Sequence, residues 1–516
     1  MTSATNRRSA SRVAARHTGA EREVPLLMGA EEFRRTGHAL VDTVAAFLES
    51  MAERPVTTGE SPGEIRRALD AAAPLPDTGS DAATLLSDAS RLLFDHSLLN
   101  GHPRFFGYIT SSPAPIGMLA ELLAAAVNAN VGAWRLSPIA SEIEAQTIRW
   151  IAELVGYPAS CGGLLVSGGN MANMVGLYAA RAAAAEWQVR AHGVAAGGAR
   201  PLRVYASRET HTWLQKATDL SGLGTDSVRW IDVDEELRMD VAALRRAIER
   251  DRAAGDLPMM VVGTAGSVST GAVDPLGEIA ELCRDERIWF HVDGAYGAFA
   301  AALPDAPAEL RLLALADSVA MDPHKWLYAP LEAGCVLVRD AGRLRDAFAY
   351  HPPYYHFGEE ATSYVDVGPQ NSRGFRALKV WLALRQVGRQ GYVRMIGDDI
   401  RLAHSLHDLV SSNPELEPFT LALSISTFRY VPRDLRGRLG EERVQSYLDA
   451  LNQELLERIQ LSGEAFVSNA VIRDRYVLRA CIVNFNTTFA DVEALPGIVV
   501  RIGGETDREL RANAGV

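Results

Sequence analysis

The chain has 516 residues, of which 47% are hydrophobic and 22% are charged. This length is too great for one compact core and predicts about two or three domains, and the composition is that of a soluble globular protein. The formal net charge of −12 excludes a general nucleic-acid binder, because such a protein needs a basic surface.

The first 25 residues carry several arginines and no acid before Glu21, a composition that transit peptides also have. They present no clear apolar face, so we predict a disordered tail over residues 1–25. Residues 26–110 are predicted to be an N-terminal helical segment, because apolar side chains spaced for one helix face indicate a helix over about 30–54.

The four cysteines lie in apolar or strand-like surroundings, and none has a C-x-x-C spacing. This pattern indicates buried free thiols in a reducing compartment, so we expect a cytoplasmic protein. The cysteines alone cannot form a metal site, and no metal is predicted. No apolar run is long enough to cross a membrane.

Short β-rich runs alternate with longer helical runs through the central region, residues 111–400. The predicted strands cover residues 163–166, 202–206, 228–233, 260–265, 288–293, 318–321 and 335–339. The predicted helices between them cover residues 170–187, 241–252 and 275–285. This alternation predicts an α/β fold with a mostly parallel central sheet.

Residues 401–516 are predicted to form a smaller C-terminal α+β domain. Its expected elements are strands over residues 421–430 and 478–484 and a helix over residues 441–459.

Lysine is rare in this chain, and one lysine lies in an unusual setting. The 52 basic residues include only three lysines, Lys216, Lys325 and Lys379. Arginine stays protonated, whereas a desolvated lysine can attack a carbonyl group and form a Schiff base. Lys325 follows a predicted strand between His324 and Trp326, which suits a closed pocket. The alternative is a surface lysine without function, and structural roles are predicted for the other two lysines.

Two further segments suit a site at the carboxyl ends of the strands. Asp293 ends a predicted buried strand, where ligands bind in open α/β sheets, and a buried carboxylate there needs a cationic partner such as a pyridinium N–H. A helix-capping role is the alternative for Asp293. Gly168, Gly169 and Asn170 follow another strand and open a helix, whose free N–H groups can bind an anion.

His211 follows the strand over residues 202–206 and precedes a helical run. An imidazole at this position suits stacking on a flat cofactor and proton transfer. A histidine without a role at a helix start is the alternative.

Taken together, these segments resemble the group II pyridoxal-phosphate-dependent amino acid decarboxylases, which include aromatic-amino-acid, glutamate and diaminobutyrate decarboxylases. The likeness runs from about His102 to Gly391. It is carried by HPRFFGY (102–108), SPIASEIE (137–144), LLVSGGNMAN (164–173), HTWLQKA (211–217), TAGSVSTGAVDPL (264–276), HVDGAYG (291–297), DPHKWL (322–327) and FRALKVW (375–381).

The resemblance implies that pyridoxal 5'-phosphate is the cofactor and that Lys325 holds it covalently as a Schiff base. Asp293 would pair with the protonated pyridine nitrogen, and His211 would stack on the ring. Tyr354, on a mobile loop that reaches the partner subunit's site, would return a proton to the product, with His211 as a second donor. The phosphate and ring would be surrounded by Gly168, Gly169, Asn170, His324, Thr264 and Ala295.

The implied fold is fold type I, the aspartate-aminotransferase type, in a homodimer with active sites at the subunit interface. The implied reaction is decarboxylation of an L-amino acid to the amine and CO2. Alternatives on the same scaffold are decarboxylation-dependent oxidative deamination to an aldehyde and transamination. A non-catalytic scaffold protein is the alternative from another class.

The expected substrate pocket departs from that of the aromatic-substrate members, which puts an aromatic substrate in doubt. Trp213 replaces a small serine, and would either fill pocket space or sandwich an indole. Arg373 would meet the substrate carboxylate or form a buried salt bridge, as would Arg376. The candidate substrate residues are Tyr108, Ile109, Asn130, Trp213 and Arg373.

Overall fold

The computed structural model describes residues 24–198, 200–350 and 361–514, and the chain divides into two compact units. The first unit holds the chain up to Ser50 together with Arg66–Asp95. In it lie helix α1 (Ala30–Glu49) and most of α3 (Ala82–His96), and Phe47 and Phe94 stack with ring centroids 3.9 Å apart. The second unit holds Met51–Ile65 and the chain from His96 onward. The predicted domain boundaries at residues 110 and 400 stay predictions.

A seven-stranded sheet forms the centre of the second unit, and it has the predicted α/β character. The strands occur in the order β1-β7-β6-β5-β4-β2-β3, and only β7 runs antiparallel to its neighbours. Nearly all of their residues are buried, as expected for a sheet covered on both faces. The strands are β1 (Gly162–Val166), β2 (Leu202–Ser207), β3 (Val228–Ile231), β4 (Leu257–Thr264), β5 (Trp289–Asp293), β6 (Ser318–Met321) and β7 (Gly334–Val338).

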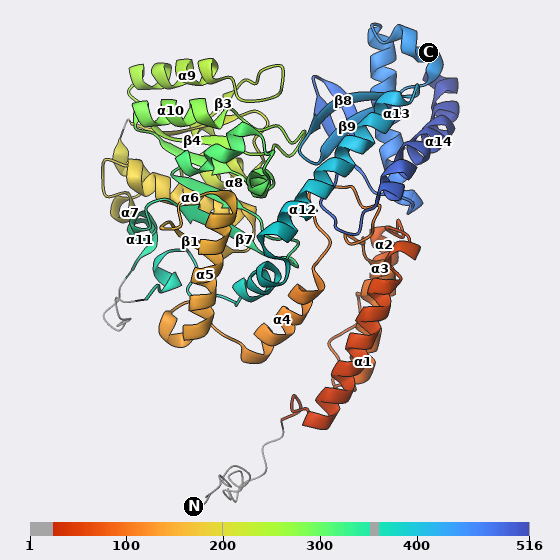
Figure 1. Ribbon diagram of the computed structural model, residues 1–516, viewed down its shortest axis with the longest axis horizontal. Coiled ribbons are helices and arrows are strands. Elements are labelled where there is room, and N and C mark those ends of the chain that lie inside the picture. Colours follow the sequence, from red (N-terminus) through yellow and green to blue (C-terminus); the bar gives the residue numbers. More distant parts are fainter. Residues whose placement is uncertain (1–23, 199, 351–360, 515–516) are drawn as a thin grey trace, which may run out of the picture. The chain divides into compact units, whose positions relative to one another are not determined.

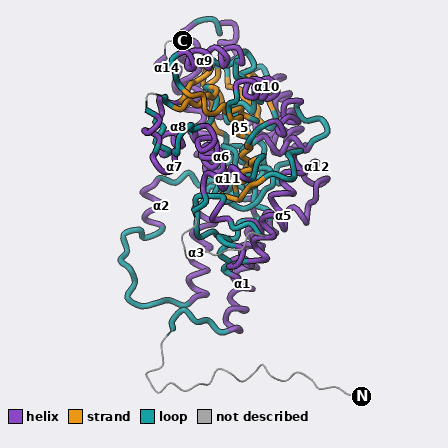
Figure 2. The backbone as a smooth tube through the Cα atoms, turned by 90° about the vertical axis from the view of Figure 1, so that its left-hand side faces the viewer, coloured by secondary structure: helices purple, strands orange, loops and turns teal. Residues whose placement is uncertain are grey.

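Helices surround these strands, which lie in the interior of the unit (Figure 2). Local sequence sets several helix ends: Pro138 starts α5 with its fixed φ, and Gly156 ends that helix in the left-handed region at φ 73°. Asp240 caps α9 by accepting a hydrogen bond from the Ala243 N–H at 3.0 Å. The helices of this region are α4 (Pro115–Val127), α5 (Pro138–Val155), α6 (Gly169–Ala184), α7 (Val189–His192), α8 (Trp213–Leu220), α9 (Val241–Ala253), α10 (Leu276–Glu286) and α11 (Gly342–Phe348). Helix α2 (Pro62–Ala68) contains the point at which the chain passes from one unit to the other.

A second, antiparallel sheet lies in the C-terminal region in the order β10-β11-β9-β8. The single strand predicted over residues 421–430 is wrong, because a turn at Leu423, with φ 49°, divides this run into a hairpin. One strand of this sheet, β10, was not predicted. The elements are β8 (Leu416–Ala422), β9 (Ile425–Tyr430), α13 (Glu442–Ser462), β10 (Ser468–Ile472), β11 (Arg475–Cys481) and α14 (Phe489–Ala514).

The long helix α12 (Ala377–Ser412) joins the two sheet regions (Figure 1). It packs against α4 and α5 beside the large sheet and against β8, β9 and α14 beside the small one. The helix is kinked at Gly388, where φ is 66°. Side chains on α12 therefore touch both hydrophobic cores of the second unit.

Across the described ranges, no helix is long and apolar enough to cross a membrane. The cytoplasmic location stays a prediction.

Candidate active site

The carboxyl ends of five parallel strands meet at one edge of the large sheet. Strands β1 and β6 both run antiparallel to β7, so β1 is parallel to β6 and to the strands beyond it. Thr264 and Asp293 end β4 and β5 and are neighbours in the sheet register. Gly168, His211 and Lys325 follow β1, β2 and β6 at the same edge. The topology thus brings the predicted residues to the edge where open α/β sheets bind ligands.

Lys325 forms an ion pair inside the loop that follows β6. Its Nζ lies 3.0 Å from Oδ2 of Asp322, a carboxylate that is 3% exposed. His324 Nε2 lies 3.6 Å from the same oxygen, and burial lowers the pKa of His324. The Ser111 hydroxyl donates to the His324 carbonyl at 2.7 Å, which ties this loop to the segment before α4. Asp322 was not predicted, although an acid three residues before the lysine was a visible signal.

A buried carboxylate on α12 holds the two aromatic side chains that follow Lys325. Asp399 Oδ2 accepts hydrogen bonds from Trp326 Nε1 at 3.0 Å and from the Tyr328 hydroxyl at 2.8 Å. The Trp326 ring also stacks on Tyr296 with centroids 4.7 Å apart. Burial raises the pKa of Asp399 to about 7, and the two hydrogen bonds oppose this rise.

We expect Asp399→Asn to make the stability of the protein less dependent on pH. Because the pKa of Asp399 is raised from 3.8 to about 7, folding binds a proton between these values, and this group's contribution to the unfolding free energy is lost as pH rises through that window. Between about pH 4 and 7 the unfolding free energy of the wild-type protein should therefore fall by up to about 4 kcal/mol more than that of the variant. Urea unfolding between pH 4 and 8 measures this, with the exposed neighbour Asp398→Asn as control. Equal pH slopes for the wild type and Asp399→Asn would contradict the expectation.

Asp293 accepts hydrogen bonds on both carboxylate oxygens. Its Oδ2 accepts from Trp213 Nε1 at 2.7 Å, and its Oδ1 accepts from the Ala295 N–H at 3.2 Å. Asp293 is 6% exposed and Trp213 is 1% exposed. Trp213 thus lies beneath the carboxylate in the core between β2, β4 and α6, and not on the wall of a substrate pocket. The expectation that Trp213 is a substrate contact is corrected on this ground.

His211 lies at the start of α8, and its side chain is exposed. Its Nδ1 accepts from the Trp213 backbone N–H at 3.2 Å, which orients the ring. Partial burial lowers the pKa of His211, while the nearby Asp293 carboxylate raises it. The lowering prevails, and because Nδ1 accepts the Trp213 N–H, the neutral ring carries its proton on Nε2 and can donate it in a hydrogen bond.

The glycine turn after β1 leaves open backbone beside the lysine loop. Gly168 has φ 144°, and a Cβ on Gly334 would lie 2.5 Å from the Gly168 backbone, so two chain segments pack here without side chains. A Cβ on Gly169 would lie 2.7 Å from Asp322 Oδ2. Asn170 is exposed, and the buried Thr264 hydroxyl has no hydrogen-bond partner among the described residues. The turn therefore presents N–H groups and the Asn170 amide to a ligand, and Thr264 at the end of β4 adds a hydroxyl at the same edge of the sheet.

Arg373 has structural partners on both Nη groups, and only its buried Nε has no acceptor within the described residues. Its guanidinium donates to both carboxylate oxygens of Glu144, at 2.5 and 3.1 Å, and to the carbonyls of Val131 and Leu165. Arg373 is 3% exposed and Glu144 is fully buried. The expectation of a carboxylate contact is therefore wrong for Arg373, and the salt-bridge alternative holds. Asn130 also has a structural contact, because its Oδ1 accepts the Arg373 N–H at 3.1 Å.

A different buried arginine has unused donors. Arg479 is 2% exposed, and its Nε and Nη2 have no acceptor within the described residues. Its Nη1 donates to the Tyr108 carbonyl at 3.1 Å. Tyr108 is 57% exposed, while Ile109 is partly buried against the large core. The predicted Tyr354 lies outside the described residues.

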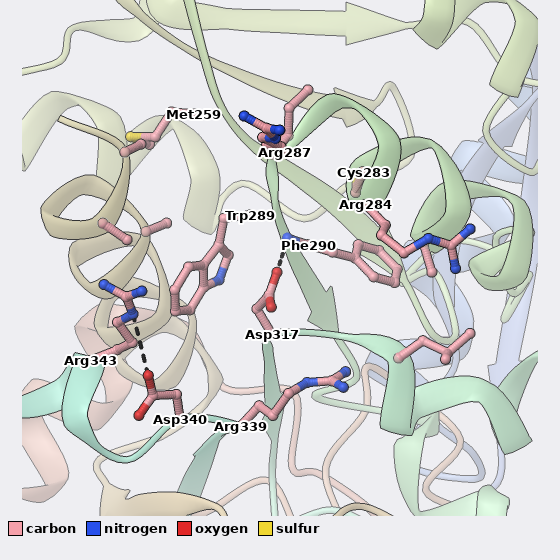
Figure 3. Close-up of a pocket in the computed structure, with 16 residues that line it drawn as sticks. Met259, Cys283, Arg284, Arg287, Trp289, Phe290, Asp317, Arg339, Asp340 and Arg343 are labelled. Atoms are coloured by element: carbon pink, nitrogen blue, oxygen red, sulfur yellow. Dashed lines mark hydrogen bonds and ion pairs between the residues drawn. The ribbon is translucent and has the colours of Figure 1, made fainter. Parts of the chain in front are cut away.

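A pocket of about 550 Å³ lies at the opposite edge of the large sheet (Figure 3). Trp289 and Phe290, which begin β5, and Asp317 line it, together with arginines that include Arg339. Asp317 accepts the Phe290 N–H at 2.8 Å across this wall. Because Trp289 and Asp293 are at opposite ends of β5, this pocket is separate from the residues around Lys325. No cluster of metal-ligating side chains occurs in the part of the chain that the structure describes.

The chain matches proteins whose chemistry suits this geometry. The family model for the pyridoxal-dependent decarboxylase conserved domain matches residues 62–429. An aromatic-L-amino-acid decarboxylase of Bacillus atrophaeus is 33% identical over 468 residues, which are 90% of this chain and 94% of that protein. A phenylacetaldehyde synthase of Petunia hybrida is 30% identical over 88% of this chain and 90% of that protein.

Solved structures give the same result. The crystal structure of Oryza sativa TDC with PLP and tryptamine aligns with a TM-score of 0.85 and 27% identity, covering 94% of this chain and 99% of that one. The crystal structure of mouse CSAD aligns with a TM-score of 0.83 and 28% identity, covering 91% and 99%. These matches confirm the predicted fold type I architecture, the pyridoxal phosphate cofactor and the carboxy-lyase activity. The chain belongs to the pyridoxal-dependent decarboxylase family.

Proposed function

We propose that the chain decarboxylates an aromatic L-amino acid to the amine and CO2, with pyridoxal phosphate bound through Lys325. The observation that carries the proposal is the convergence of Lys325, Asp293 and His211 at the carboxyl edge of one sheet. It is supported by two relatives, the Bacillus atrophaeus aromatic-L-amino-acid decarboxylase and the Oryza sativa structure with tryptamine. Trp213, which had argued against a large substrate, is buried beneath Asp293.

The residues present fit this cofactor. A phosphate suits the helix start at Gly168 and Gly169, and a side chain on Gly169 would collide with Asp322. A pyridinium N–H suits the buried carboxylate of Asp293, and the buried Thr264 hydroxyl beside it in the sheet register is a further polar contact. Asn170, Ala295 and His324 complete the proposed cofactor site.

When bound, the cofactor supplies an acceptor for the electrons that CO2 leaves behind. The chain's own residues have the other tasks. Lys325 has to leave its ion pair with Asp322 and lose a proton before its amine can react. His211 can donate a hydrogen bond from Nε2, because its Nδ1 accepts the Trp213 N–H. We assign the substrate carboxylate to Arg479, whose Nη1 donates to the Tyr108 carbonyl and whose Nε and Nη2 have no acceptor within the described residues. Proton return from Tyr354 stays a prediction.

We expect Gly169→Ala to weaken cofactor binding by about 10- to 100-fold. The added Cβ would lie 2.7 Å from Asp322 Oδ2 and 3.0 Å from the Ala295 Cβ, so the turn or the lysine loop has to shift. Overpacking of this kind costs about 1–3 kcal/mol. Equilibrium dialysis of the cofactor against the apo protein measures the affinity. Gly497→Ala on α14 is the control, because nothing lies within 4 Å of its Cβ position.

A substrate screen tests the proposed function. Purified protein loaded with cofactor is given tryptophan, tyrosine, phenylalanine, glutamate or diaminobutyrate, and CO2 release is measured with amine identification by mass. Turnover should be confined to the aromatic amino acids. Release of CO2 from glutamate or diaminobutyrate alone would overturn the proposed substrate class.

The aldehyde-forming reaction is a second candidate, favoured by the likeness to the Petunia hybrida phenylacetaldehyde synthase. The same screen separates the two, because oxidative deamination yields aldehyde, ammonia and peroxide in place of the amine. We expect the amine as the main product.

We propose that the protein is a homodimer with active sites at the interface. Support comes from α4, where four apolar side chains are more than half exposed: Leu119, Leu122, Leu123 and Val127. Sedimentation should give twice the chain mass of 55.9 kDa. A species of single-chain mass at micromolar concentration would contradict the dimer.

A further inference from the structure

Trp213 is the side chain that meets the back of the Asp293 carboxylate. It begins α8, and its indole N–H donates to Asp293 Oδ2 at 2.7 Å, a distance typical of a strong charge-assisted hydrogen bond. An indole is a donor only, so it cannot take a proton from Asp293 or pass one to it. The indole is 1% exposed and Asp293 is 6% exposed, so this hydrogen bond is buried.

His291 holds the indole in place from below. Its ring lies edge-on to Trp213 with centroids 6.0 Å apart and an interplanar angle of 73°. His291 Nε2 lies 2.7 Å from Asn173 Oδ1, an acceptor, so this nitrogen carries the proton. Nδ1 then accepts from the Ser318 hydroxyl at 2.7 Å, and Ser318 in turn accepts from Trp289 Nε1 at 2.8 Å. Every member of this chain therefore has a defined direction of donation.

The support beneath Asp293 is electrically neutral. Burial lowers the pKa of His291 to about 4, which keeps the imidazole uncharged at pH 7. Trp213, Ser318 and Asn173 carry no charge at any ordinary pH. The charged groups that act on His211 include Asp293 and Lys325, and both belong to the proposed cofactor site.

The two carboxylate oxygens of Asp293 therefore have different partners: one binds Trp213, and the other is available to the cofactor nitrogen. Oδ2 is committed to Trp213, whereas Oδ1 has only the weaker Ala295 N–H at 3.2 Å and can accept a second donor. A hydrogen bond donated to a carboxylate favours its ionised form. An ionised Asp293 is the partner that leaves a shared proton on a pyridine nitrogen.

We propose that Trp213 is a positioning residue that keeps Asp293 ionised through the Nε1–Oδ2 hydrogen bond and so keeps the shared proton on the pyridine nitrogen of the cofactor. The inference rests on the proposed binding of pyridoxal phosphate between Lys325 and Asp293. It gives Trp213 a task in the chemistry although the indole touches neither substrate nor cofactor ring. Without the indole N–H, the carboxylate becomes the stronger base and draws the proton from nitrogen to oxygen.

The test is the ¹⁵N NMR signal of pyridoxal phosphate labelled at the pyridine nitrogen and bound to the full chain. In the wild-type protein the signal should have the upfield position of a protonated nitrogen. Trp213→Phe, which keeps an aromatic ring and removes the donor, should move the signal downfield toward that of neutral pyridine. The matched control is Trp289→Phe, which removes an indole donor from the hydrogen bonds around His291 but not from Asp293, and its signal should not move. An unmoved signal in Trp213→Phe, or equal shifts in both variants, overturns the proposal.

A second measurement uses only the wild-type sequence and so does not depend on the variant folding. The protein is labelled with ¹⁵N in the tryptophan indoles and loaded with pyridoxal phosphate or with 5-deazapyridoxal phosphate, which has carbon in place of the pyridine nitrogen. One indole N–H signal should differ between the two complexes, because the Asp293 partner on Oδ1 differs. Identical indole spectra overturn the proposal. Failure of either ligand to form a borohydride-reducible bond to Lys325 would instead refute the proposed function.

Discussion

Lys325→Ala is expected to lower turnover by about 10⁴-fold or more, because it removes the amine that binds the cofactor covalently. Purified wild-type protein should show visible absorbance that borohydride abolishes. After this reduction the cofactor should be found attached to the peptide that contains Lys325. The variant should show no such adduct, even if pyridoxal phosphate still binds without a covalent bond. Stopped assays of CO2 release, together with absorbance spectra, measure both effects.

The chain offers an internal control, since only three lysines are present. Lys216 is exposed on α8, and Lys216→Ala should leave turnover and the adduct unchanged. Lys379 is buried in an ion pair with Glu121 at 2.5 Å, so its loss should affect stability and not the adduct. Normal turnover in Lys325→Ala, or an adduct on another lysine, would refute the assignment of Lys325.

Arg373→Met is expected to destabilise the fold by about 3–5 kcal/mol, because it leaves the fully buried Glu144 without its cation. Four donated hydrogen bonds are lost at the same time, two of them to the backbone of Val131 and Leu165. Urea unfolding followed by circular dichroism should show a lower midpoint. Turnover per folded molecule should be much less affected, since both Nη groups of the side chain have structural partners.

A double-mutant cycle tests the cause. Glu144→Leu combined with Arg373→Met removes both charges, so the pair should be less destabilised than the sum of the single variants. Arg376→Met is the comparison, because its partner Glu332 is exposed and the pair contributes about 1 kcal/mol or less. Additive single effects in the Glu144–Arg373 cycle would show that the ion pair is not the source of the loss.

The strands and the site at their carboxyl ends were predictable from local sequence. Short apolar runs bounded by glycine and polar residues mark β1, β5 and β6, and the residues just after such runs have to lie at one edge of a parallel sheet. The roles of Lys325 and Asp293 could be inferred because few residue types can form a Schiff base or pair with a pyridinium N–H. The hairpin in the small sheet was missed because Leu423, which has the left-handed φ of 49°, is not one of the residues that favour this conformation, and the single Ser424 beside it is a weak turn signal.

Side-chain partners that are distant in sequence were not predictable. Whether Arg373 meets a substrate or Glu144 depends on how α5 lies against the loop before α12. The direction of the Trp213 indole on α8 depends on His291 and Asp293, which belong to β5 and are distant in sequence. Asp399 gives no local signal in a long polar helix face, and only the fold shows that it holds Trp326.

The pairing of β1 with β7 has a consequence for how the protein is made. Leu165 pairs with Cys335, and the glycine turn after β1 packs against Gly334, so this contact closes a loop that contains most of the large domain. Closing long loops is entropically unfavourable and slows folding. Before β7 has left the ribosome and paired with β1, the glycine turn and Lys325 are therefore not yet close together and cannot bind the cofactor. Refolding protein should accordingly bind added cofactor late, and the rate of binding should report the rate at which β7 pairs with β1.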